Sequence, residues 1–440
     1  MAEKFSTYQD ALSFLYAQLP MYQRQGGKAF KPGLDNIKRL LAAIGHPEQK
    51  YPCVHIAGTN GKGSTSHMIA AVLQASGLKV GMYTSPHYVD FRERMKINGA
   101  LIPEQTVLDF TNQRAELMER IQPSYFELTV AMAFDYFAQE SVDVAVIETG
   151  LGGLLDSTNV VDPLLSVITN IGFDHMDVLG DTLPEIAFQK AGIIKPERPV
   201  VIGVTHPETE AVFRKVAKEN ASSINFADQL LEMTLNDQQM GTMNLDVEQS
   251  GAMLFSGLQV QAAGAYQIQN LRTAIQSLLL LKPHFTLTEE AFRNGFMHLK
   301  SLTYFVGRWQ ILAQQPLIIT DSGHNVDGVA LAMEQLQSYE YDQLHLVIGF
   351  SQGKEHEVLL KLFPTNATFY WTQPSVPRAL PVTALENLTQ AAQLSGTSYP
   401  NVQTALQAAL YTANPKDLIF IGGSSFMVAD VLALDLFADQ

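Results

Sequence analysis

The chain has 440 residues, of which 46% are hydrophobic and 17% charged, and a formal net charge of −15 at pH 7. This length exceeds what one ordinary hydrophobic core accommodates, so two or more domains are expected, and the composition is too apolar for a disordered protein. The acidic balance argues against a nucleic-acid partner. The single cysteine, Cys53, excludes internal disulfides and cysteine-based zinc clusters.

Cys53 lies in an apolar run, which favours a small buried residue over a catalytic thiol. The first ten residues are polar and lack the apolar core of a signal peptide. No apolar stretch of the sequence reaches membrane-spanning length. We therefore expect a cytoplasmic protein without a membrane partner.

Strand-like apolar runs alternate with helical patterns along most of the chain, which predicts an α/β fold with a largely parallel sheet. In the first half we expect strands at 53–57, 79–83, 142–148, 164–169 and 199–204, and helices at 66–75, 104–120, 128–139 and 183–191. From about 226 to 258 the sequence changes to short, polar, β-like pieces, and a helix is expected at 270–281.

A second α/β series follows, with strands expected at 317–321, 344–350, 367–371 and 418–422. The segment 300–307 has no clear period, and we interpret it as a hinge between domains. The predicted domains are therefore 1–299 and 300–440.

The segment 54–65 has the order expected of a phosphate-binding loop: a short apolar strand, a glycine-rich turn, then Lys62 and hydroxyl residues at the start of a helix. Glycines let backbone N–H groups approach an anion, the lysine adds a full positive charge, and a hydroxyl can reach Mg²⁺. Only two residues separate Gly58 from Gly61, where the strict pattern has four. An amphipathic helix is expected over 66–75, ended by Gly77. The alternative is a strand-to-helix turn without a ligand.

Two polar side chains follow strands at the edge where open α/β sheets bind their ligands. Ser85 comes after the second predicted strand, and Glu148 ends the third. Carboxylate and hydroxyl oxygens suit Mg²⁺, so both residues are candidate metal ligands. The alternatives are a capping or salt-bridged carboxylate for Glu148 and a turn residue before proline for Ser85.

Two further residues are candidates on different grounds. His175 follows a strand that we expect to neighbour the strand of Glu148, which makes it a candidate ligand of a second metal, although a lone histidine is usually structural. Lys190 lies in an apolar helical run, and a buried ammonium is costly unless it is paired or chemically altered. The alternative for Lys190 is a surface lysine with only its stem buried.

In the second half, a polar loop with Asp321 and His324 follows the strand predicted at 317–321, and Arg308 precedes that strand. Taken together, these segments resemble the folylpolyglutamate synthase/dihydrofolate synthase family, within the Mur-ligase superfamily. The matching segments follow in family order from about residue 50 to 425: 58–64, 83–86, 146–153, 156–159, 174–175, 190–194, Gln267, Asn270, 307–308, 321–325 and 377–381.

The resemblance implies a P-loop-type, mostly parallel N-terminal domain that binds ATP and folate, and a smaller Rossmann-like C-terminal glutamate ligase domain. It implies an ATP-dependent amide ligase that adds L-glutamate to dihydropteroate, to (tetrahydro)folyl-glutamates, or to both, through an acyl phosphate. The expected partners are these small molecules, and a monomer is expected.

The resemblance also assigns roles to residues, with Lys62, His175 and Lys190 implied as catalytic. The first Mg²⁺ is assigned to Ser85 and Glu148, and a second to His175 and Lys190, whose family counterpart is carbamylated. ATP contacts are implied for Gly58, Thr59, Asn60, Gly61, Lys62, Gly63, Ser64, Asn270, Arg308, Asp321 and His324. The pteridine side is implied for Ser124, Tyr125, Phe126, Glu127, Leu155, Asp156 and Ser157.

The sequence departs from the family pattern at Leu154 in place of Arg, Gln189 in place of Glu, Val326 in place of Pro, and 305–306 where Pro is usual. None removes a metal ligand or Lys62, so they bear on substrate preference more than on catalysis.

Two other functions fit part of this pattern. A Mur-type peptidoglycan ligase shares fold and chemistry, but the segments 84–86 and 155–159 and the lack of an N-terminal uridine-nucleotide-binding domain count against it. A catalytically silent nucleotide-binding regulator would need ATP contacts but not a second metal site, so the retention of His175 and Lys190 counts against that function.

Overall fold

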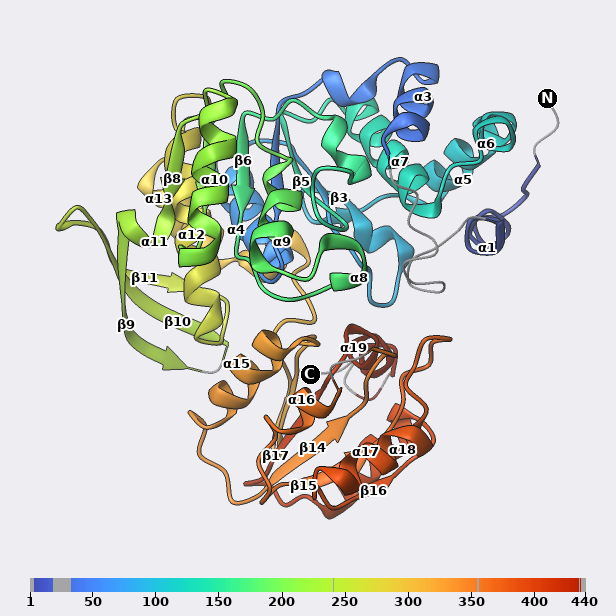
Figure 1. Cartoon of the computed structure of the whole chain (residues 1–440), viewed down its shortest axis with the longest axis vertical. Helices are drawn as coiled ribbons and strands as arrows, with labels where there is room; N and C mark the ends of the chain where they lie inside the picture. The colour runs from blue at the N-terminus through green and yellow to red at the C-terminus, as the bar shows by residue number, and fades with distance from the viewer. Residues whose placement is uncertain (1–3, 19–32, 240, 354–355, 435, 437–440) are drawn as a thin grey trace.

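The computed structural model describes residues 4–18, 33–239, 241–353, 356–434 and 436. Two α/β units, each with its own parallel sheet, are arranged one above the other, and a small antiparallel sheet lies beside the first (Figure 1). The predicted fold class is confirmed. Among the described helices, none has both the length and the hydropathy that crossing a membrane requires.

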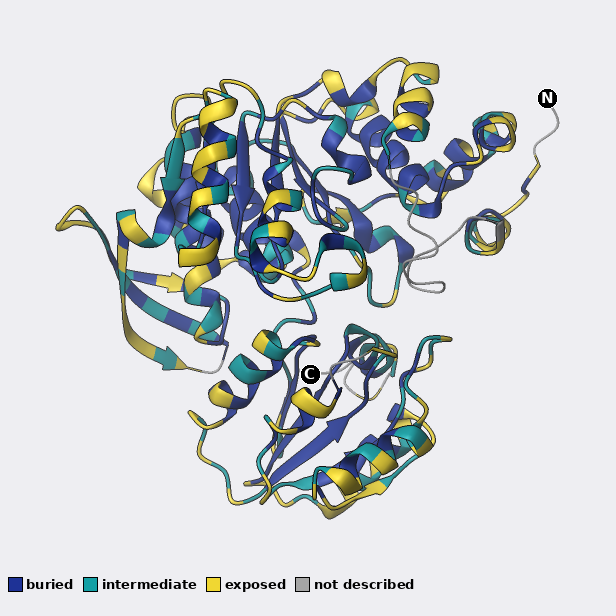
Figure 2. Cartoon of the chain, viewed as in Figure 1, coloured by how far each residue is buried: buried dark blue, intermediate teal, exposed yellow. Residues whose placement is uncertain are grey.

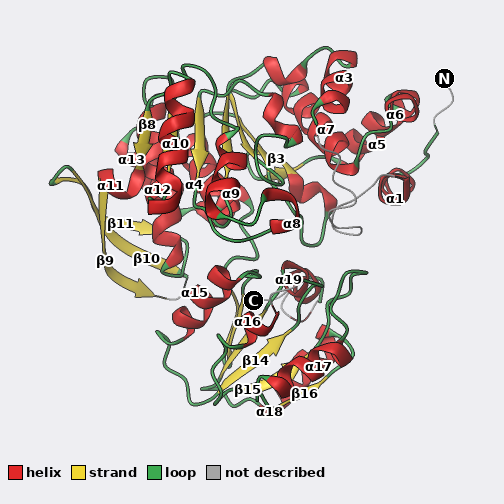
Figure 3. Cartoon of the chain, viewed as in Figure 1, coloured by secondary structure: helices red, strands yellow, loops and turns green. Residues whose placement is uncertain are grey.

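The large sheet has the strand order β4-β3-β2-β5-β1-β6-β7-β8. Its pairs are parallel except for β2–β3 and β3–β4. The strands are β1 (Cys53–Ala57), β2 (Val80–Tyr83), β3 (Met95–Ile97), β4 (Ala100–Leu101), β5 (Val144–Glu148), β6 (Leu165–Ile168), β7 (Val200–Ile202) and β8 (Ile224–Phe226). Every residue of β1, β2 and β5 is buried, because helices cover both faces of a parallel sheet (Figures 2 and 3).

Helices on the two faces of this sheet form separate cores. Val54 and Ile56 of β1 face a core with α4 (Lys62–Ala75), α12 (Tyr266–Leu281) and α13 (Glu289–Met297). The opposite face is covered by α3 (Asp35–Ala43), α7 (Tyr125–Gln139), α9 (Leu183–Ala191) and α10 (Pro207–Glu219). The other α-helices in the described part of the first unit are α1 (Tyr8–Gln18), α5 (Glu104–Gln113), α6 (Ala115–Ile121), α8 (Met176–Leu179) and α11 (Ala227–Leu230), and α14 (Leu299–Thr303) leads to the second unit.

Three details differ from the predicted elements. Helix α4 is buried on all sides from Ser64 to Leu73 rather than amphipathic, because α12 and α13 cover the face that would otherwise meet solvent. The helix predicted at 104–120 is two helices, α5 and α6, which break at Arg114 (φ −109°, ψ 7°). The segment interpreted as an aperiodic hinge begins with the short helix α14, and its role as a hinge stays a prediction.

The polar, β-like stretch is confirmed as an antiparallel sheet of β9 (Leu231–Gln239), β10 (Thr242–Gln249) and β11 (Ala252–Val260), with β10 in the middle. Alternate residues of β10 are buried, including Met243, Leu245 and Val247. They join the core around α4, so this sheet extends the first unit rather than forming a separate one.

The second unit has a six-stranded sheet of order β12-β13-β17-β14-β15-β16, parallel except for β12. Its strands are β12 (Gln310–Gln314), β13 (Leu317–Thr320), β14 (Leu344–Ile348), β15 (Thr368–Trp371), β16 (Gly396–Ser398) and β17 (Leu418–Gly422). Its helices are α15 (Val326–Leu336), α16 (His356–Leu360), α17 (Val382–Ala391), α18 (Val402–Thr412) and α19 (Ser425–Leu432). The domain boundary near residue 300 stays a prediction.

Candidate active site

The glycine-rich turn after β1 leads directly into α4, as the sequence predicts. Gly61 caps this helix at φ +83°, a conformation that glycine adopts without strain, and a Cβ there would collide with the side-chain oxygen of Asn270. The Lys62 ammonium folds back over the turn and donates to the carbonyl oxygens of Gly58 and Thr59, both at 3.0 Å. In the described part of the chain, no carboxylate forms an ion pair with Lys62, so its charge is available to an anion.

Glu148 ends β5, which lies between β1 and β2 in the sheet, so its carboxylate reaches the edge where the glycine-rich turn begins. Glu148 is 3% exposed, and its nearest hydrogen bond is a long one of 3.4 Å from the backbone N–H of Ser85. Burial raises the pKa of Glu148 to about 7, against the charges of Lys62 and Arg308. Among the described residues Glu148 has no ion pair, so the salt-bridged alternative is not what the structure contains.

Lys190 is 3% exposed, and its ammonium donates to the carbonyl oxygen of Gly58 at 2.8 Å. The same carbonyl accepts from Lys62, so two lysines from distant segments converge on one backbone oxygen. Burial, with a further contribution from the Lys62 charge, lowers the pKa of Lys190 to about 7. This excludes the alternative of a surface lysine with an exposed head.

His175 has a positive φ of 51° and precedes the first residue of α8. Its Nε2 lies 3.7 Å from one carboxylate oxygen of Asp174, and the other oxygen lies 3.5 Å from Nε2 of His324. Burial would raise the pKa of Asp174, but the hydrogen bond from His324 and the charge of His175 hold it well below its usual range. Asp174 thus lies between His175 of the first unit and His324 of the second, which are both predicted site residues.

The expected adjacency of the His175 and Glu148 strands is wrong. The strand before His175 is β6, which pairs with β1, and β1 separates it from β5. The glycine-rich turn that follows β1 therefore lies between the two candidate metal ligands, so any metal at His175 is on the opposite side of that turn from Glu148.

The predicted site residues of the second half are held by hydrogen bonds. The carboxylate of Asp321 accepts from the backbone N–H groups of Trp309 and Gly323 and from the Tyr266 hydroxyl, each at 2.8 Å. Asn270, on α12, donates to Gln267 at 2.9 Å and lies against Gly61. Arg308 donates to the hydroxyl of Tyr88, which belongs to the first unit.

The residues predicted for the pteridine side lie at the start of a helix and in a short turn. Ser124 and Glu127 make a capping box that starts α7, which carries Tyr125 and Phe126 on its first turn. The Phe126 ring lies against Gly150, where a Cβ would collide with it.

The short turn on that side is organised by Asp156. Its carboxylate accepts from the backbone N–H groups of Gly150, Leu151 and Thr158 at 2.8–2.9 Å. Leu155 and Ser157 flank Asp156, which therefore shapes the turn that carries them. Contact of any of these residues with a substrate stays a prediction.

Two Mur ligase families match this chain: the Mur ligase middle domain over residues 56–278 and the Mur ligase glutamate ligase domain over residues 307–425. The dihydrofolate synthase/folylpolyglutamate synthase of Bacillus subtilis (strain 168) is 32% identical over 439 residues, which cover 97% of this chain and 99% of that protein. This chain belongs to the folylpolyglutamate synthase/dihydrofolate synthase family of Mur ligases.

Two solved structures support the same assignment. E. coli FolC in complex with DHPP and ADP has 27% sequence identity and a TM-score of 0.84, covering 98% of both chains. A bifunctional folylpolyglutamate synthase/dihydrofolate synthase with Mn, AMPPNP and L-glutamate bound has 27% identity and a TM-score of 0.83, covering 97% of this chain and 98% of that one. The ligase is therefore an ATP-dependent glutamate ligase of folate metabolism, and the main prediction is confirmed over its alternatives.

The donor set at the edge of the large sheet fits a hard divalent cation. Ser85 offers a hydroxyl, and Glu148 a buried carboxylate with a single long hydrogen bond. Within the described residues no group of three or more His, Cys, Asp and Glu side chains could hold a metal by itself. A metal at this edge would therefore need oxygens from the nucleotide as well.

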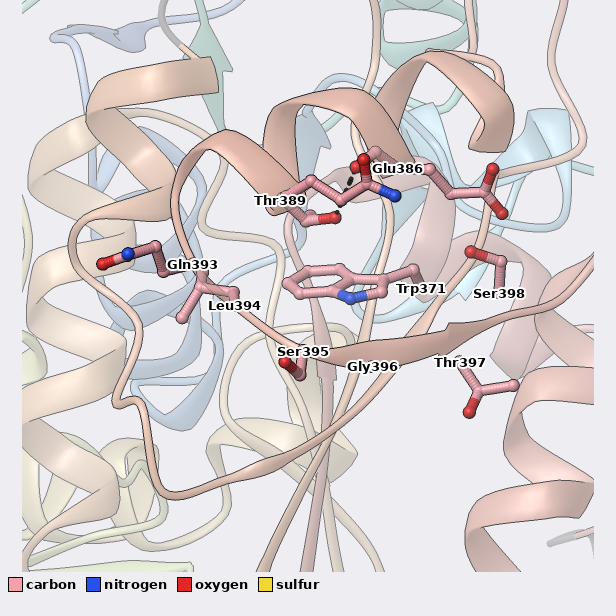
Figure 4. Close-up of a pocket in the computed structure, with 10 residues that line it drawn as sticks. Trp371, Glu386, Thr389, Gln393, Leu394, Ser395, Gly396, Thr397 and Ser398 are labelled. Atoms are coloured by element: carbon pink, nitrogen blue, oxygen red, sulfur yellow. Dashed lines mark hydrogen bonds between the residues drawn. The ribbon is translucent and has the colours of Figure 1, made fainter.

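Two cavities of the ligase lie away from these residues. One of about 580 Å³ is in the second unit, where Trp371 lies between α17 and β16 and is surrounded by polar side chains such as Glu386 and Thr389 (Figure 4). Another of about 560 Å³ is lined by residues of α3 and by Leu154 and Lys195. None of the predicted site residues lines either cavity, so we locate the active site by its side-chain chemistry.

Several contacts that shape the site were not predicted, although Asn60 itself was predicted as an ATP contact. The side-chain amides of Asn60 and Asn325 donate to each other, at 3.2 and 3.1 Å, and join the glycine-rich turn to the second unit. Asn170 accepts from the backbone N–H of Asn60 at 2.8 Å. Tyr88 reaches across to Arg308. The segments that resemble the family contain both Asn60 and Asn325. Their contact joins residues 265 positions apart, so no local sequence pattern could predict it.

Proposed function

We propose that the ligase binds ATP with a divalent metal at the carboxyl edge of β1, β2 and β5, and transfers L-glutamate to dihydropteroate, to folyl-glutamates, or to both. The observation that carries this proposal is the convergence of Lys62, Lys190 and Glu148 on one glycine-rich turn. Among the described residues, neither lysine forms an ion pair with a carboxylate, and Glu148 forms none with a lysine or arginine. The relatives solved with ADP and DHPP, and with Mn, AMPPNP and L-glutamate, support the same ligand classes.

In this proposal the chain works chiefly by holding reactants and neutralising charge. The backbone N–H groups of 58–64 and the helix N-terminus of α4 would cradle the phosphates, and Lys62 would compensate the charge on the transferred phosphoryl group. Asn270, Arg308, Asp321 and His324 would hold the nucleotide from the other side. The carboxylate of the pteroate or folate substrate attacks the γ-phosphorus and ADP leaves. The neutral glutamate amine then attacks the acyl carbon, inorganic phosphate leaves, and the amine gives up one proton to solvent.

Ser85 and Glu148 would hold the first metal, and His175 with Lys190 a second. When bound, such an ion neutralises the charge on the phosphates. On the pteridine side, Phe126 offers an aromatic surface and the 155–157 turn offers backbone groups, with Ser124, Tyr125 and Glu127 beside them.

We further propose that Lys190 is carbamylated. The neutral amine attacks CO₂, a C–N bond forms, and one proton leaves to solvent, so the product is an anionic oxygen ligand. A pKa near 7 supports this, because a substantial part of the amine is then neutral under ordinary conditions. Gln189 beside it, in place of the family's Glu, leaves the local charge less negative.

One assay tests the proposal directly. The purified ligase is given ATP, Mg²⁺ and L-glutamate with either dihydropteroate or tetrahydrofolate, and ADP release and the glutamylated product are measured. Substrate-dependent ADP release with one or both acceptors is expected, and which of them works separates the two activities. ADP release without a glutamylated product, for every acceptor, would contradict the proposal. The monomeric state and the cytoplasmic location stay predictions.

A further inference from the structure

Tyr88 lies only three residues after Ser85, in the loop between β2 and the 3₁₀ turn η3 (Phe91–Arg94), yet its side chain reaches the second unit. Its hydroxyl is 3.3 Å from both the carbonyl oxygen of Gly307 and the hydroxyl of Ser322, and it accepts from the Arg308 guanidinium. One phenol therefore joins the loop of a predicted metal ligand to two loops of the second unit.

The loop that carries Tyr88 is held in one conformation by Glu93. The two carboxylate oxygens of Glu93 accept from the backbone N–H groups of Tyr88, Val89 and Asp90, at 2.7, 3.0 and 2.9 Å. Glu93 is 5% exposed, so these charge-assisted bonds are shielded from water. Tyr88 therefore projects from a rigid support rather than from a free loop.

The second unit is shaped to receive the ring. Gly307 has φ +73°, and a Cβ there would lie 2.5 Å from the Tyr88 ring, so glycine is required for both its conformation and its space. The guanidinium carbon of Arg308 lies 5.9 Å from the ring centroid. In the described part of the chain no carboxylate forms an ion pair with Arg308, which leaves the phenol to fix the direction of its guanidinium.

We propose that Tyr88 is a positioning residue for the ligation reaction. It holds Arg308 and the loop of Ser322 in register with the loop of Ser85, so that the nucleotide contacts of the two units are set together. This inference rests on the proposed function, because it assumes that Arg308 contacts ATP. Tyr88 acts through Arg308 and need not touch the substrate.

The test compares two variants that each remove one hydrogen-bonded tyrosine hydroxyl. Tyr88→Phe removes the bridging phenol, and Tyr51→Phe removes a hydroxyl that donates to the backbone of Phe134, also at 3.3 Å, inside the first unit. We expect Tyr88→Phe to raise the KM for ATP about tenfold, since hydrogen bonds to charged groups have that order of effect, with a smaller change in kcat. Tyr51→Phe should leave the KM for ATP within about twofold of the wild type.

A second comparison uses Arg308→Lys, which keeps the charge but loses the planar fork. If Tyr88 acts through Arg308, adding Tyr88→Phe to Arg308→Lys should change the KM for ATP by less than about twofold. A raised KM in Arg308→Lys with a wild-type KM in Tyr88→Phe would overturn the role of Tyr88 alone. A wild-type KM in Arg308→Lys would overturn the ATP contact of Arg308 in the proposed function, and this inference with it.

Discussion

Two polar loops, one after β1 and one after β13, belong to the proposed ATP site, and their side chains differ in how many hydrogen-bond partners they have. At the first, Lys62 donates only to backbone oxygens, as does Lys190, which reaches this loop from α9; the nearby Glu148 has one long hydrogen bond. In the second, Asp321 accepts three hydrogen bonds, and Asn325 caps α15 by accepting from Gly328 at 2.9 Å. The first loop has charged groups without ion-pair partners among the described residues, so we expect it to need a bound ligand. The second loop has side chains with their hydrogen bonds already made, so we expect it to orient that ligand.

The largest effects are expected at the first loop and at Glu148, which ends β5 beside it. Lys62→Ala and Glu148→Ala should each lower kcat/KM by at least about two orders of magnitude, because each removes a charge that no described neighbour replaces. Steady-state ADP release measures this, with circular dichroism as the check on folding. Wild-type turnover in a folded variant would remove that residue from the ATP–metal site.

A somewhat smaller loss is expected for Lys190. We expect Lys190→Ala to lose most activity, by about one to two orders of magnitude, and acetate or formate to restore part of it by filling the space of the carbamate. The matched control is Lys195→Ala, because Lys195 is a half-buried lysine that donates to the carbonyl oxygen of Asn159 at 2.9 Å. A crystal structure grown with bicarbonate and Mg²⁺ that ends at a bare Nζ, far from any metal, would refute carbamylation.

The unpaired charges also predict how stability depends on pH when metal and bicarbonate are absent. Glu148, with its pKa raised from 4.5 to about 7, binds its proton more tightly in the folded state, so stability falls as pH rises through that window. Lys190, with its pKa lowered from 10.5 to about 7, is protonated more readily when unfolded, so stability rises between those values.

Each group should give the free energy of unfolding a slope of on the order of 1 kcal/mol per pH unit within its window, measured by denaturant titration. Glu148→Gln should flatten only the descending part, and Lys190→Met only the ascending part. Equal slopes in the wild type and both variants would mean that other groups dominate.

The smallest effect is expected in the second loop. Asn325→Ser keeps an oxygen that can cap α15 but loses the amide that pairs with Asn60, so the KM for ATP should rise about threefold with kcat nearly unchanged. Isothermal titration with ADP gives an independent measure of the same change. If Asn325→Ser lowered kcat/KM as much as Lys62→Ala, the proposed difference in role between the two loops would be wrong.

Local patterns were enough to predict the elements that their own residues determine. The strands β1 and β17 were predicted to the residue, because each is a short, mainly apolar run bounded by proline, aspartate or glycine. The burial of α4 could not be predicted, since it depends on α12 and α13, some two hundred residues away. For the same reason the sequence left open whether Lys190 was exposed.

The candidate site shows the same difference between what local sequence and what long-range contacts determine. Strand ends and glycines pointed to Lys62, Ser85 and Glu148 from the sequence alone, while the roles of Asn270 and Arg308 came only from the family resemblance. The order of the strands decides which ends are neighbours, and it is a long-range property. This is why the expected adjacency of the strands that precede His175 and carry Glu148 was wrong. Tyr88 was missed because the hydrogen-bond partners of its hydroxyl lie more than two hundred residues along the chain.

The position of Cys53 has a practical consequence. It is the single cysteine of the chain, 2% exposed at the start of β1, and burial raises the pKa of its thiol to about 12. The native protein should therefore be inert to maleimide dyes. A pair of surface cysteines, one at Tyr411, which is 94% exposed, and one at Phe188, which is 51% exposed, would take a fluorophore pair without background labelling. Energy transfer between them would then report the distance between the two units during turnover.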